Sequence, residues 1–528
     1  MSFLLALALL GPFAALLWFA AGPTAGAAEH WGYACRGLVG SLWLGLSVAA
    51  ISTVVGFALA FVVTYYRFAG RAALRKILVL PLLLPPVAVA VIYEELFSGA
   101  GPLGDLVRRG LLPALELRSA TGFVFAMSVS LYPFAYLLCR AKLEDHGEAP
   151  FELGACLGLG RRRAVRRILL PLCVPALALG AGLVFMEAAG DWQTASVLSV
   201  DTTSAVLHEL WFGREQPRIA ARLSLLLVAV LLLCVAAADR WLRPARLRHV
   251  LGAPGRPGHG EALRPRRAGP AALLACLLPA LLGFAVPLGA VLVLFERTVH
   301  KVDLSLLSTG SLHTLVLLAA VGLGGLVLAA GVTYASHARP GAATRFLLLF
   351  AALSYLLPAM VFALAVLVLA SKGLFFVERY GNTAALGILV YALALRLVCF
   401  FVIPIQVGLA SLPPRLAELG ASLRMKPWSS FRALQLPPLG RFVFVGLLLV
   451  LLQTLREIAL TVVLHPFGFE PISLKVYSFM RIHMLPESAA WVLVLAVLGM
   501  GPLWALEGLS DRGRASERRA GAAARAGL

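Results

Sequence analysis

The sequence predicts an all-α integral membrane protein with about twelve transmembrane helices. Hydrophobic residues make up 60% of the 528 residues and charged residues only 14%, with a mean hydropathy of +0.89. A soluble domain carries roughly 45–50% apolar and about 25% charged residues. Residues 168–186 and 268–295 contain no Asp, Glu, Lys or Arg, and about 20 apolar residues suffice for a helix to span the hydrocarbon core. The short alternating strands typical of a transmembrane barrel are absent from the sequence.

Twelve apolar segments are expected to be the membrane spans. The first, residues 2–22, lacks the basic start of a secretory signal peptide, so it is interpreted as a membrane helix. The others are predicted at 38–64, 77–97, 121–139, 168–189, 222–239, 270–295, 312–336, 346–370, 383–409, 440–464 and 488–508. Proline inside several of these segments does not exclude them, because membrane helices tolerate it.

The distribution of basic residues predicts the orientation of the chain in the inner membrane. Arg and Lys are concentrated in the second, fourth and sixth loops and in the C-terminal tail, whereas the odd-numbered loops balance them with acids such as Glu94 and Asp105. Basic loops are typical of the cytoplasmic side, so both termini are expected there. Short basic clusters between apolar spans also argue against nucleic-acid binding, despite the net charge of +20. The lipid bilayer is the expected surrounding partner.

Composition divides the chain into four predicted regions. Residues 1–239 and 270–510 hold six apolar segments each. Residues 240–269 are rich in Arg, Pro and Gly and are expected to be a basic cytoplasmic linker. Residues 511–528 are expected to be a basic cytoplasmic tail. The seven cysteines form no CxxC pair, so neither a disulfide framework nor a zinc site is expected, and no cofactor is predicted.

An internal repeat relates the two halves. Residues 152–171 read ELGACLGLGRRRAVRRILLP and residues 418–437 read ELGASLRMKPWSSFRALQLP, with eight of twenty positions identical at an offset of 266. Each copy lies between the fourth and fifth apolar segments of its half. Pro150 and the spacing of Leu153 and Leu157 predict a short helix with one apolar edge. Such a helix lies on the membrane surface or docks into a groove of another protein. Gly158 and Gly160 then permit a sharp turn.

These two loops resemble the coupling loops of binding-protein-dependent ABC importer permeases, of the fused two-half type. The family pattern is Glu-Ala-Ala, three residues, Gly, nine residues, a hydrophobic residue, one residue, then Leu-Pro. The resemblance implies that each loop forms a coupling helix in a cleft of a separate ATPase subunit, expected to be a dimer. It also implies that a periplasmic binding protein delivers the substrate. The matching residues are Glu152, Gly158, Ile168, Leu170 and Pro171 in the first copy and Glu418, Leu434, Leu436 and Pro437 in the second.

The copies depart from the family pattern in two ways. Gly154 and Gly420 stand where the family has its second alanine. In the second copy Arg424 replaces the motif glycine, so Lys426-Pro427 is expected to shape that turn instead. The two halves are therefore expected to couple unequally to the ATPase.

Sequence features also weigh against other classes of protein. The chain contains no phosphate-binding loop and no Gly-Lys dipeptide, so any ATP hydrolysis is expected in another chain. A secondary carrier of the major facilitator type has its hallmark loop between the second and third helices. Here residues 67–71 match it only in part and lack its Asp. A membrane-embedded enzyme would need convergent catalytic residues, and the sequence suggests none.

Two further stretches of sequence and three acids bear on the identity of the cargo and on its path. Residues 185–213 and 455–470 resemble ferric-iron importer permeases, which implies ferric iron as cargo. Thiamine and phosphonate permeases are alternatives, because they too can be fused two-half chains. Glu187, Asp191 and Glu457 are candidates for the translocation path.

The spacing of two of these acids suggests where they lie. A helix rises about 24 Å from Pro171 to Glu187 and about 30 Å from Pro437 to Glu457. Both acids are therefore expected near the periplasmic mouth on equivalent helices. The plainer interpretation is that they are interfacial residues satisfied by water or by Arg456. Likewise, Arg396 is interpreted as neutralising a neighbouring helix.

Overall fold

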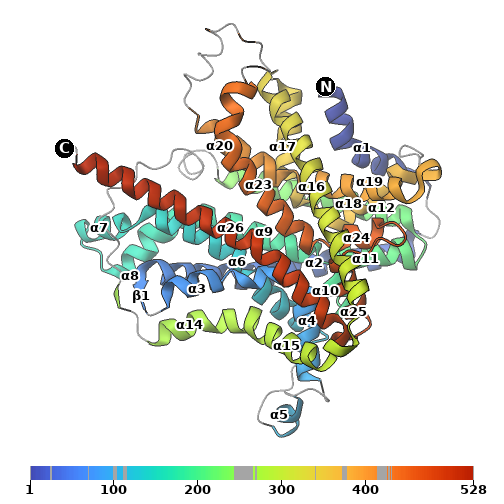
Figure 1. Ribbon diagram of the computed structural model, residues 1–528, viewed down its shortest axis with the longest axis horizontal. Coiled ribbons are helices and arrows are strands. Elements are labelled where there is room, and N and C mark those ends of the chain that lie inside the picture. Colours follow the sequence, from blue (N-terminus) through green and yellow to red (C-terminus); the bar gives the residue numbers. More distant parts are fainter. Residues whose placement is uncertain are drawn as a thin grey trace.

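The computed structural model describes residues 2–23, 27–68, 70–98, 104–110, 116–242, 266–267, 270–338, 341–371, 377–412, 422, 425, 429 and 431–526. Helices dominate these residues (Figure 1). In the first half they are α1 Ser2–Ala20, α2 Ala27–Tyr65, α3 Arg71–Ile77, η1 Leu80–Leu83, α4 Pro86–Phe97, α5 Gly104–Arg108, α6 Ala120–His146, α7 Ala149–Cys156, α8 Arg161–Ala164, η2 Val165–Leu169, α9 Leu170–Gly190, α10 Gln193–Val197, α11 Thr203–His208, η3 Glu209–Gly213 and α12 Pro217–Leu242. In the second half they are α14 Pro270–Ala280, η4 Leu281–Ala285, α15 Val286–Thr298, η5 Val299–Lys301, α16 Leu304–Ala338, α17 Ala342–Leu353, η6 Ser354–Leu356, α18 Ala359–Ser371, α19 Val377–Leu397, α20 Cys399–Ala410, η7 Phe431–Gln435, α23 Leu436–Arg456, α24 Ala459–Leu464, α25 Ile472–Arg481 and α26 Leu485–Ala526. Two residue pairs, β1 Tyr66–Arg67 and β2 Arg266–Arg267, form a short parallel ladder.

The predicted fold class is confirmed: the chain is an all-α integral membrane protein. Within the described residues, seven helices are long and apolar enough to cross a membrane, or up to nine if each of two bent pairs is one span. Each of the twelve predicted segments contains helix. Large apolar side chains face outward along the long helices, for example Val54 on α2 and Leu323 on α16, which are 69% and 66% exposed. Lipid is the environment in which such faces are stable.

Several predicted spans are not single straight helices, and proline explains two of the breaks. The segment at 77–97 is broken, because Arg71–Leu83 and Pro86–Phe97 meet at 92°. Leu84 and Pro85 are extended there, since proline disfavours helical geometry in the residue before it and cannot donate a backbone hydrogen bond. Pro358 similarly separates α17 and η6 from α18. The segment at 383–409 bends by 42° between α19 and α20.

The repeat seen in the sequence recurs in the helix boundaries. The π-helical turns η2 and η7 begin at Val165 and Phe431, which the repeat offset relates. The same offset relates the helices that follow them, α9 and α23. It also relates the starts of the short helices α10 and α24, at Gln193 and Ala459. Packing repeats as well, since α6 lies against α9 and α20 lies against α23.

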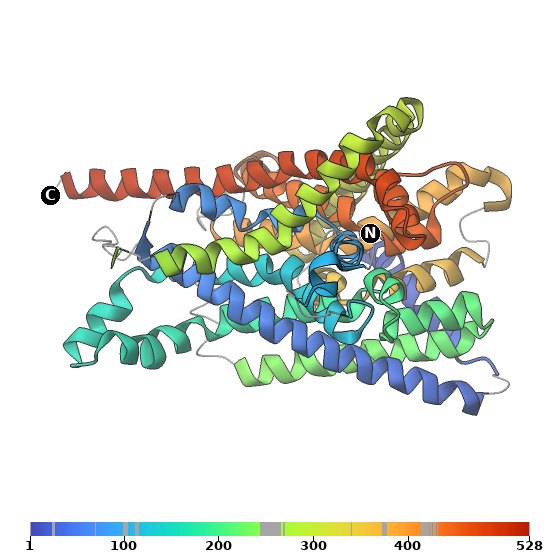
Figure 2. The ribbon, with the colours of Figure 1, turned by 90° about the horizontal axis from the view of Figure 1, so that it is seen from below.

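The first helix of each half packs against helices of the other half. The helix α1 packs on α17 and α18 of the second half, and η4 and α15 pack on η1 and α4 of the first half (Figure 1). The helix α7 and the C-terminal end of α26 both lie toward the same end of the molecule (Figures 1 and 2). The starts of α11 and α12 lie toward the opposite end.

Candidate coupling helix and translocation site

The helix α7 presents an exposed edge to the surroundings. Glu152 is exposed, and Leu153 and Leu157 are 51% and 62% exposed. Leucines at this spacing share a helix face. The predicted short helix with an apolar edge is therefore present, and its apolar edge is available to a partner.

The turn after α7 depends on Gly158. Its φ is +64°, a left-handed conformation that glycine adopts without the steric cost of a side chain. The Leu159 N–H donates to Gly154 O at 2.8 Å and the Gly158 N–H donates to Ala155 O at 3.0 Å. This pair of bonds is the Schellman arrangement that closes a helix C-terminus. The predicted role of Gly158 in a sharp turn is confirmed.

Gly154 lets α7 approach α8 closely. It is buried, and a Cβ atom at this position would lie 2.7 Å from the Ala164 Cβ. Real side chains are not found at that separation, so the alanine of the family pattern does not fit here without a shift. The basic stretch predicted to connect α7 to the next span is itself helical: α8, η2 and α9 form one apolar helix from Arg161 to Gly190.

Aromatic and charged groups fix α7 to the helices beside it. The Tyr65 hydroxyl donates to Gly147 O at 2.9 Å, and its ring packs edge-on against Phe151 at 5.1 Å. The Arg161 guanidinium covers the same Phe151 ring, with its Cζ 4.2 Å from the centroid. Burial raises the pKa of the nearby Glu148 carboxyl, an effect that Arg161 opposes and Glu152 reinforces.

Pro171 and Pro437 both follow a π-helical turn. Each is the second residue of its helix, α9 or α23, directly after η2 or η7. Proline cannot donate to a carbonyl of the preceding turn, and a π-helical turn in the preceding residues accommodates that lost bond. Of the second predicted coupling loop, Glu418, Gly420 and Arg424 lie outside the described residues.

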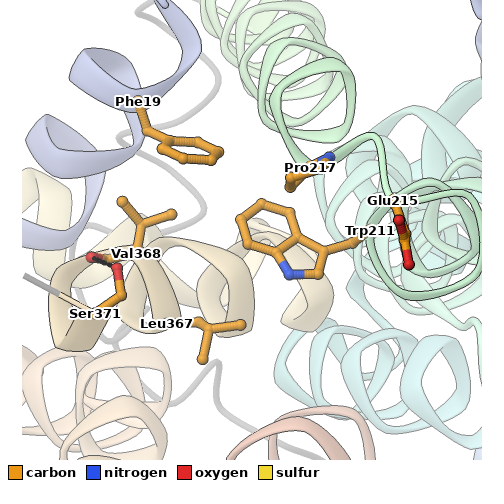
Figure 3. Close-up of a pocket in the computed structure, with 7 residues that line it drawn as sticks. All are labelled: Phe19, Trp211, Glu215, Pro217, Leu367, Val368 and Ser371. Atoms are coloured by element: carbon orange, nitrogen blue, oxygen red, sulfur yellow. Dashed lines mark hydrogen bonds between the residues drawn. The ribbon is translucent and has the colours of Figure 1, made fainter.

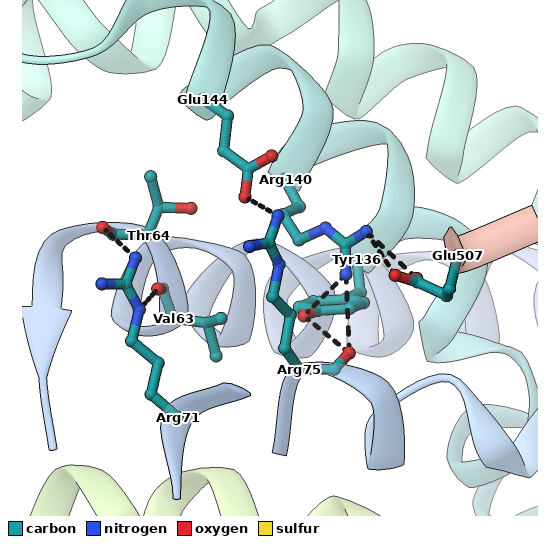
Figure 4. Close-up of polar contacts among 8 residues, drawn as sticks. All are labelled: Val63, Thr64, Arg71, Arg75, Tyr136, Arg140, Glu144 and Glu507. Atoms are coloured by element: carbon teal, nitrogen blue, oxygen red, sulfur yellow. Dashed lines mark hydrogen bonds and ion pairs between the residues drawn. The ribbon is translucent and has the colours of Figure 1, made fainter. Parts of the chain in front are cut away.

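A polar network links α6, the helix that leads into α7, to the second half (Figure 4). Arg140 and Glu507 form an ion pair at 3.0 Å with side chains only 3% and 8% exposed. Arg140 also contacts the Tyr136 hydroxyl at 3.4 Å, and Arg75 pairs with Glu144 at 2.6 Å. Glu507 belongs to α26, so a buried charge pair joins the two halves.

The three acids predicted for the translocation path surround one small interior cavity. Its volume is about 50 Å³, enough for only a few water molecules. Both halves contribute to its wall, with Pro86, Met186, Glu187, Gly190, Asp191 and Gln193 from the first and Tyr355, Ala359, Arg396, Gln453, Arg456, Glu457, Ile458 and Ala459 from the second. The acids therefore lie around a partly open space between the halves.

Each acid is held by a hydrogen-bond donor. Tyr355 donates its hydroxyl proton to Glu187 and accepts a hydrogen bond from the Gln453 amide at 2.9 Å. Glu457 forms an ion pair with Arg396, and both residues are 8% exposed. This confirms that Arg396 neutralises a neighbouring helix, whereas Arg456 lies over the Phe134 ring at 5.6 Å.

Glu187 lies in α9 and Glu457 directly follows α23, and the repeat offset relates these two helices. At the offset of 266, Asp191 is the equivalent of Glu457, and Glu187 is the equivalent of Gln453. Asp191 accepts a hydrogen bond from the Thr194 N–H at 2.7 Å, and Glu457 accepts one from the Leu460 N–H at 3.4 Å. Each acid thus accepts a hydrogen bond from a backbone N–H in the first turn of the short helix that follows it, α10 or α24. The two acids expected on equivalent helices therefore do not stand at equivalent positions of the repeat.

Sequence reasoning missed Tyr355 and Gln453. The repeat offset could have identified Gln453, because it makes that residue the equivalent of Glu187 in the other half. No local pattern marked Tyr355, which is 8% exposed and stacks under the Arg396 guanidinium at 4.7 Å.

Part of the chain is similar in sequence to known transport permeases. Residues 52–248 match the family described as binding-protein-dependent transport system inner membrane component. The sulfate transport system permease protein CysT of Salmonella typhimurium is 27% identical over 186 residues, 34% of this chain and 66% of that protein. CysW of Escherichia coli, also a sulfate transport system permease protein, is 28% identical over 30% of this chain and 55% of its own length. A probable molybdenum ABC transporter permease protein of Haloferax volcanii is 29% identical over 29% of this chain and 55% of that protein. The chain thus spans less than two thirds of the length of each of these relatives.

Proposed function

We propose that this chain is the membrane-spanning permease subunit of an ABC importer, which works with a separate ATPase and a periplasmic binding protein. The observation that carries the proposal is the exposed helix α7, with its Gly158 turn, inside the segment 52–248 that matches the transport family. The relatives are named as permease proteins. The absence of a phosphate-binding loop from the sequence supports placing ATP hydrolysis in another chain.

The test is assembly with the ATPase subunit encoded nearest to this chain. Leu157→Cys on α7 is expected to form a disulfide or short cross-link with a cysteine in the ATPase, whereas Leu323→Cys is not. Leu323 is a matched control because it is exposed to a similar degree on α16. The purified chain alone is expected to hydrolyse no ATP and to stimulate turnover once the ATPase is added. ATP turnover by the chain alone would contradict the proposal.

We further propose that cargo passes between the two halves at the 50 Å³ cavity. Its wall comes from both halves, and the Tyr355 hydroxyl joins Glu187 of the first half to Gln453 of the second. The cavity has room for only a few water molecules, so we propose that the halves separate here during transport. The contact of Tyr355 with Glu187 is the bond that would have to break.

For the cargo, we propose a small oxyanion of the sulfate or molybdate class. The relatives carry sulfate and molybdenum in their names. Two arginines, Arg396 and Arg456, line the cavity, and the Nε atom of each is buried without a hydrogen-bond partner. Guanidinium groups suit oxyanions. The three carboxylates already accept hydrogen bonds from protein donors.

Ferric iron is the second candidate, because residues 185–213 and 455–470 resemble ferric-iron permeases and three carboxylates line the cavity. Uptake of labelled sulfate, molybdate, ferric iron, thiamine and phosphonate is measured in cells with and without the chain. Loss of sulfate or molybdate uptake alone supports the oxyanion. Loss of iron uptake alone rejects it and leaves the permease role intact.

A further inference from the structure

A pocket of about 460 Å³ (Figure 3) lies at the start of α12, which is toward the end of the molecule opposite α7 (Figure 1). It lies between α1, α18 and the start of α12, and therefore between the two halves. Its lining residues are Phe19, Trp211, Glu215, Pro217, Leu367, Val368 and Ser371. The Phe19 and Trp211 rings form a tilted pair in its wall, with centroids 5.7 Å apart. Its size is typical of sites that hold an organic ligand.

The surface around the pocket is apolar and aromatic. On α1, Leu17 and Trp18 are 56% and 64% exposed beside Phe19, and Phe212 is 47% exposed beside Trp211. Exposed aromatic side chains at the ends of membrane helices are typical of the level of the lipid headgroups. The pocket is therefore continuous with a surface that lipid covers.

Charged groups stand at the rim of the pocket. Arg218 is exposed, its guanidinium lies 5.9 Å from the Phe19 centroid, and it donates to Pro23 O at 2.6 Å. Arg214 does not line the pocket, because it pairs with Glu209 at 3.5 Å and covers the Tyr33 ring at 4.4 Å. Glu215, between them in the sequence, lines the pocket and is also exposed. Guanidinium groups bind phosphate well, and a carboxylate pairs with an ammonium group.

We propose that this pocket binds one phospholipid with an ethanolamine headgroup. One acyl chain lies against Trp211, Leu367 and Val368, the phosphate lies at Arg218, and the ammonium group lies at Glu215. The lipid then fills the space between α1 and α12 on one side and α18 on the other, and it joins the two halves where protein contacts leave a gap. The inference does not depend on the transport function.

Native mass spectrometry of the detergent-purified chain tests occupancy. The wild-type chain is expected to retain one phospholipid, and Leu367→Trp, which fills the pocket, is expected to retain none. Leu323→Trp is the matched control, because it adds the same indole to a lipid-facing site on α16 that is 66% exposed, and it is expected to retain the lipid. Equal retention by Leu367→Trp and wild type would overturn the proposal.

Thermal unfolding of the delipidated chain tests the headgroup. Added dioctanoyl phosphatidylethanolamine is expected to raise the unfolding midpoint of wild type more than dioctanoyl phosphatidylglycerol does, because bound ligands stabilise the folded state. The preference is expected to disappear in Glu215→Gln, and the response to both lipids is expected to fall in Arg218→Gln. If Leu367→Trp does not fold, Leu367→Phe replaces it. An equal shift with octyl glucoside, which fills the pocket without a phosphate, would reject the headgroup assignment.

Discussion

Asp191 and Glu457 occupy the same position in the two halves, and each carboxylate accepts a hydrogen bond from a backbone N–H in the first turn of the short helix that follows. The duplicated chain has therefore kept an acid that starts a short helix beside the central cavity. The two positions differ in their surroundings, because Glu457 also holds the buried Arg396 guanidinium.

This difference predicts unequal effects of neutralising the two acids. Glu457→Gln leaves Arg396 buried without its counter-charge and is expected to lower the free energy of unfolding by about 3–5 kcal/mol. Asp191→Asn keeps an acceptor for the Thr194 N–H and is expected to cost about 1 kcal/mol or less. Thermal unfolding in detergent measures both. Adding Arg396→Met to Glu457→Gln is expected to recover part of the loss, and no recovery would show that the ion pair is not the cause.

Removing the Tyr355 hydroxyl is expected to loosen the contact between the halves. In Tyr355→Phe, Glu187 loses a donor and Gln453 loses an acceptor, at a cost of about 1–3 kcal/mol to the closed arrangement. ATP turnover of the assembled transporter without binding protein is then expected to rise roughly fivefold or more. Tyr93→Phe is the control, because the Tyr93 hydroxyl also crosses between halves, to Leu282 O at 2.6 Å, but Tyr93 does not line the cavity. Equal effects of the two variants would remove the special role of Tyr355.

A single methyl group at position 154 is expected to displace α7. Gly154→Ala places a Cβ 2.7 Å from the Ala164 Cβ, and such overpacking costs about 1–3 kcal/mol. ATP-driven uptake is expected to fall while membrane insertion stays normal. Gly160→Ala is the control, because nothing lies within 4 Å of its added Cβ. The double variant Gly154→Ala/Ala164→Gly restores the space and is expected to regain uptake; if it does not, close packing on α8 is not the reason for the glycine.

The two coupling loops are expected to contribute unequally to transport. Glu152→Ala removes an exposed acid on α7, beside the glycine turn, and Glu418→Ala makes the same change in the copy that has Arg424 in place of that glycine. Both variants are expected to insert normally and to reduce uptake, by different factors. Wild-type uptake by both would mean that these loops do not couple to the ATPase.

The positions of the helices could be predicted from the sequence. Their bends and their contacts with one another were harder to predict. Long apolar segments must be helical in lipid, so each of the twelve predictions contains helix. The 92° break at Pro85-Pro86 was not predicted, because proline in a membrane helix is tolerated whether the helix continues or stops. The Gly158 turn was predictable because it is local. The contacts of Tyr355 with Glu187 and of Arg140 with Glu507 join residues that are far apart in the chain, and no local periodicity encodes such partners.

The packing of α1 on α17 and α18 has a consequence for the order in which the chain matures during synthesis. The helix α1 is made first, yet its partners end at Ser371. At about 5–20 residues per second, roughly 20–70 s pass between the emergence of α1 and that of α18. During this time α1 can pack on α12 of the first half, but the face that packs on α17 and α18 is covered by lipid until those helices emerge. An early stop codon in the second half would therefore leave α1 without the helices α17 and α18.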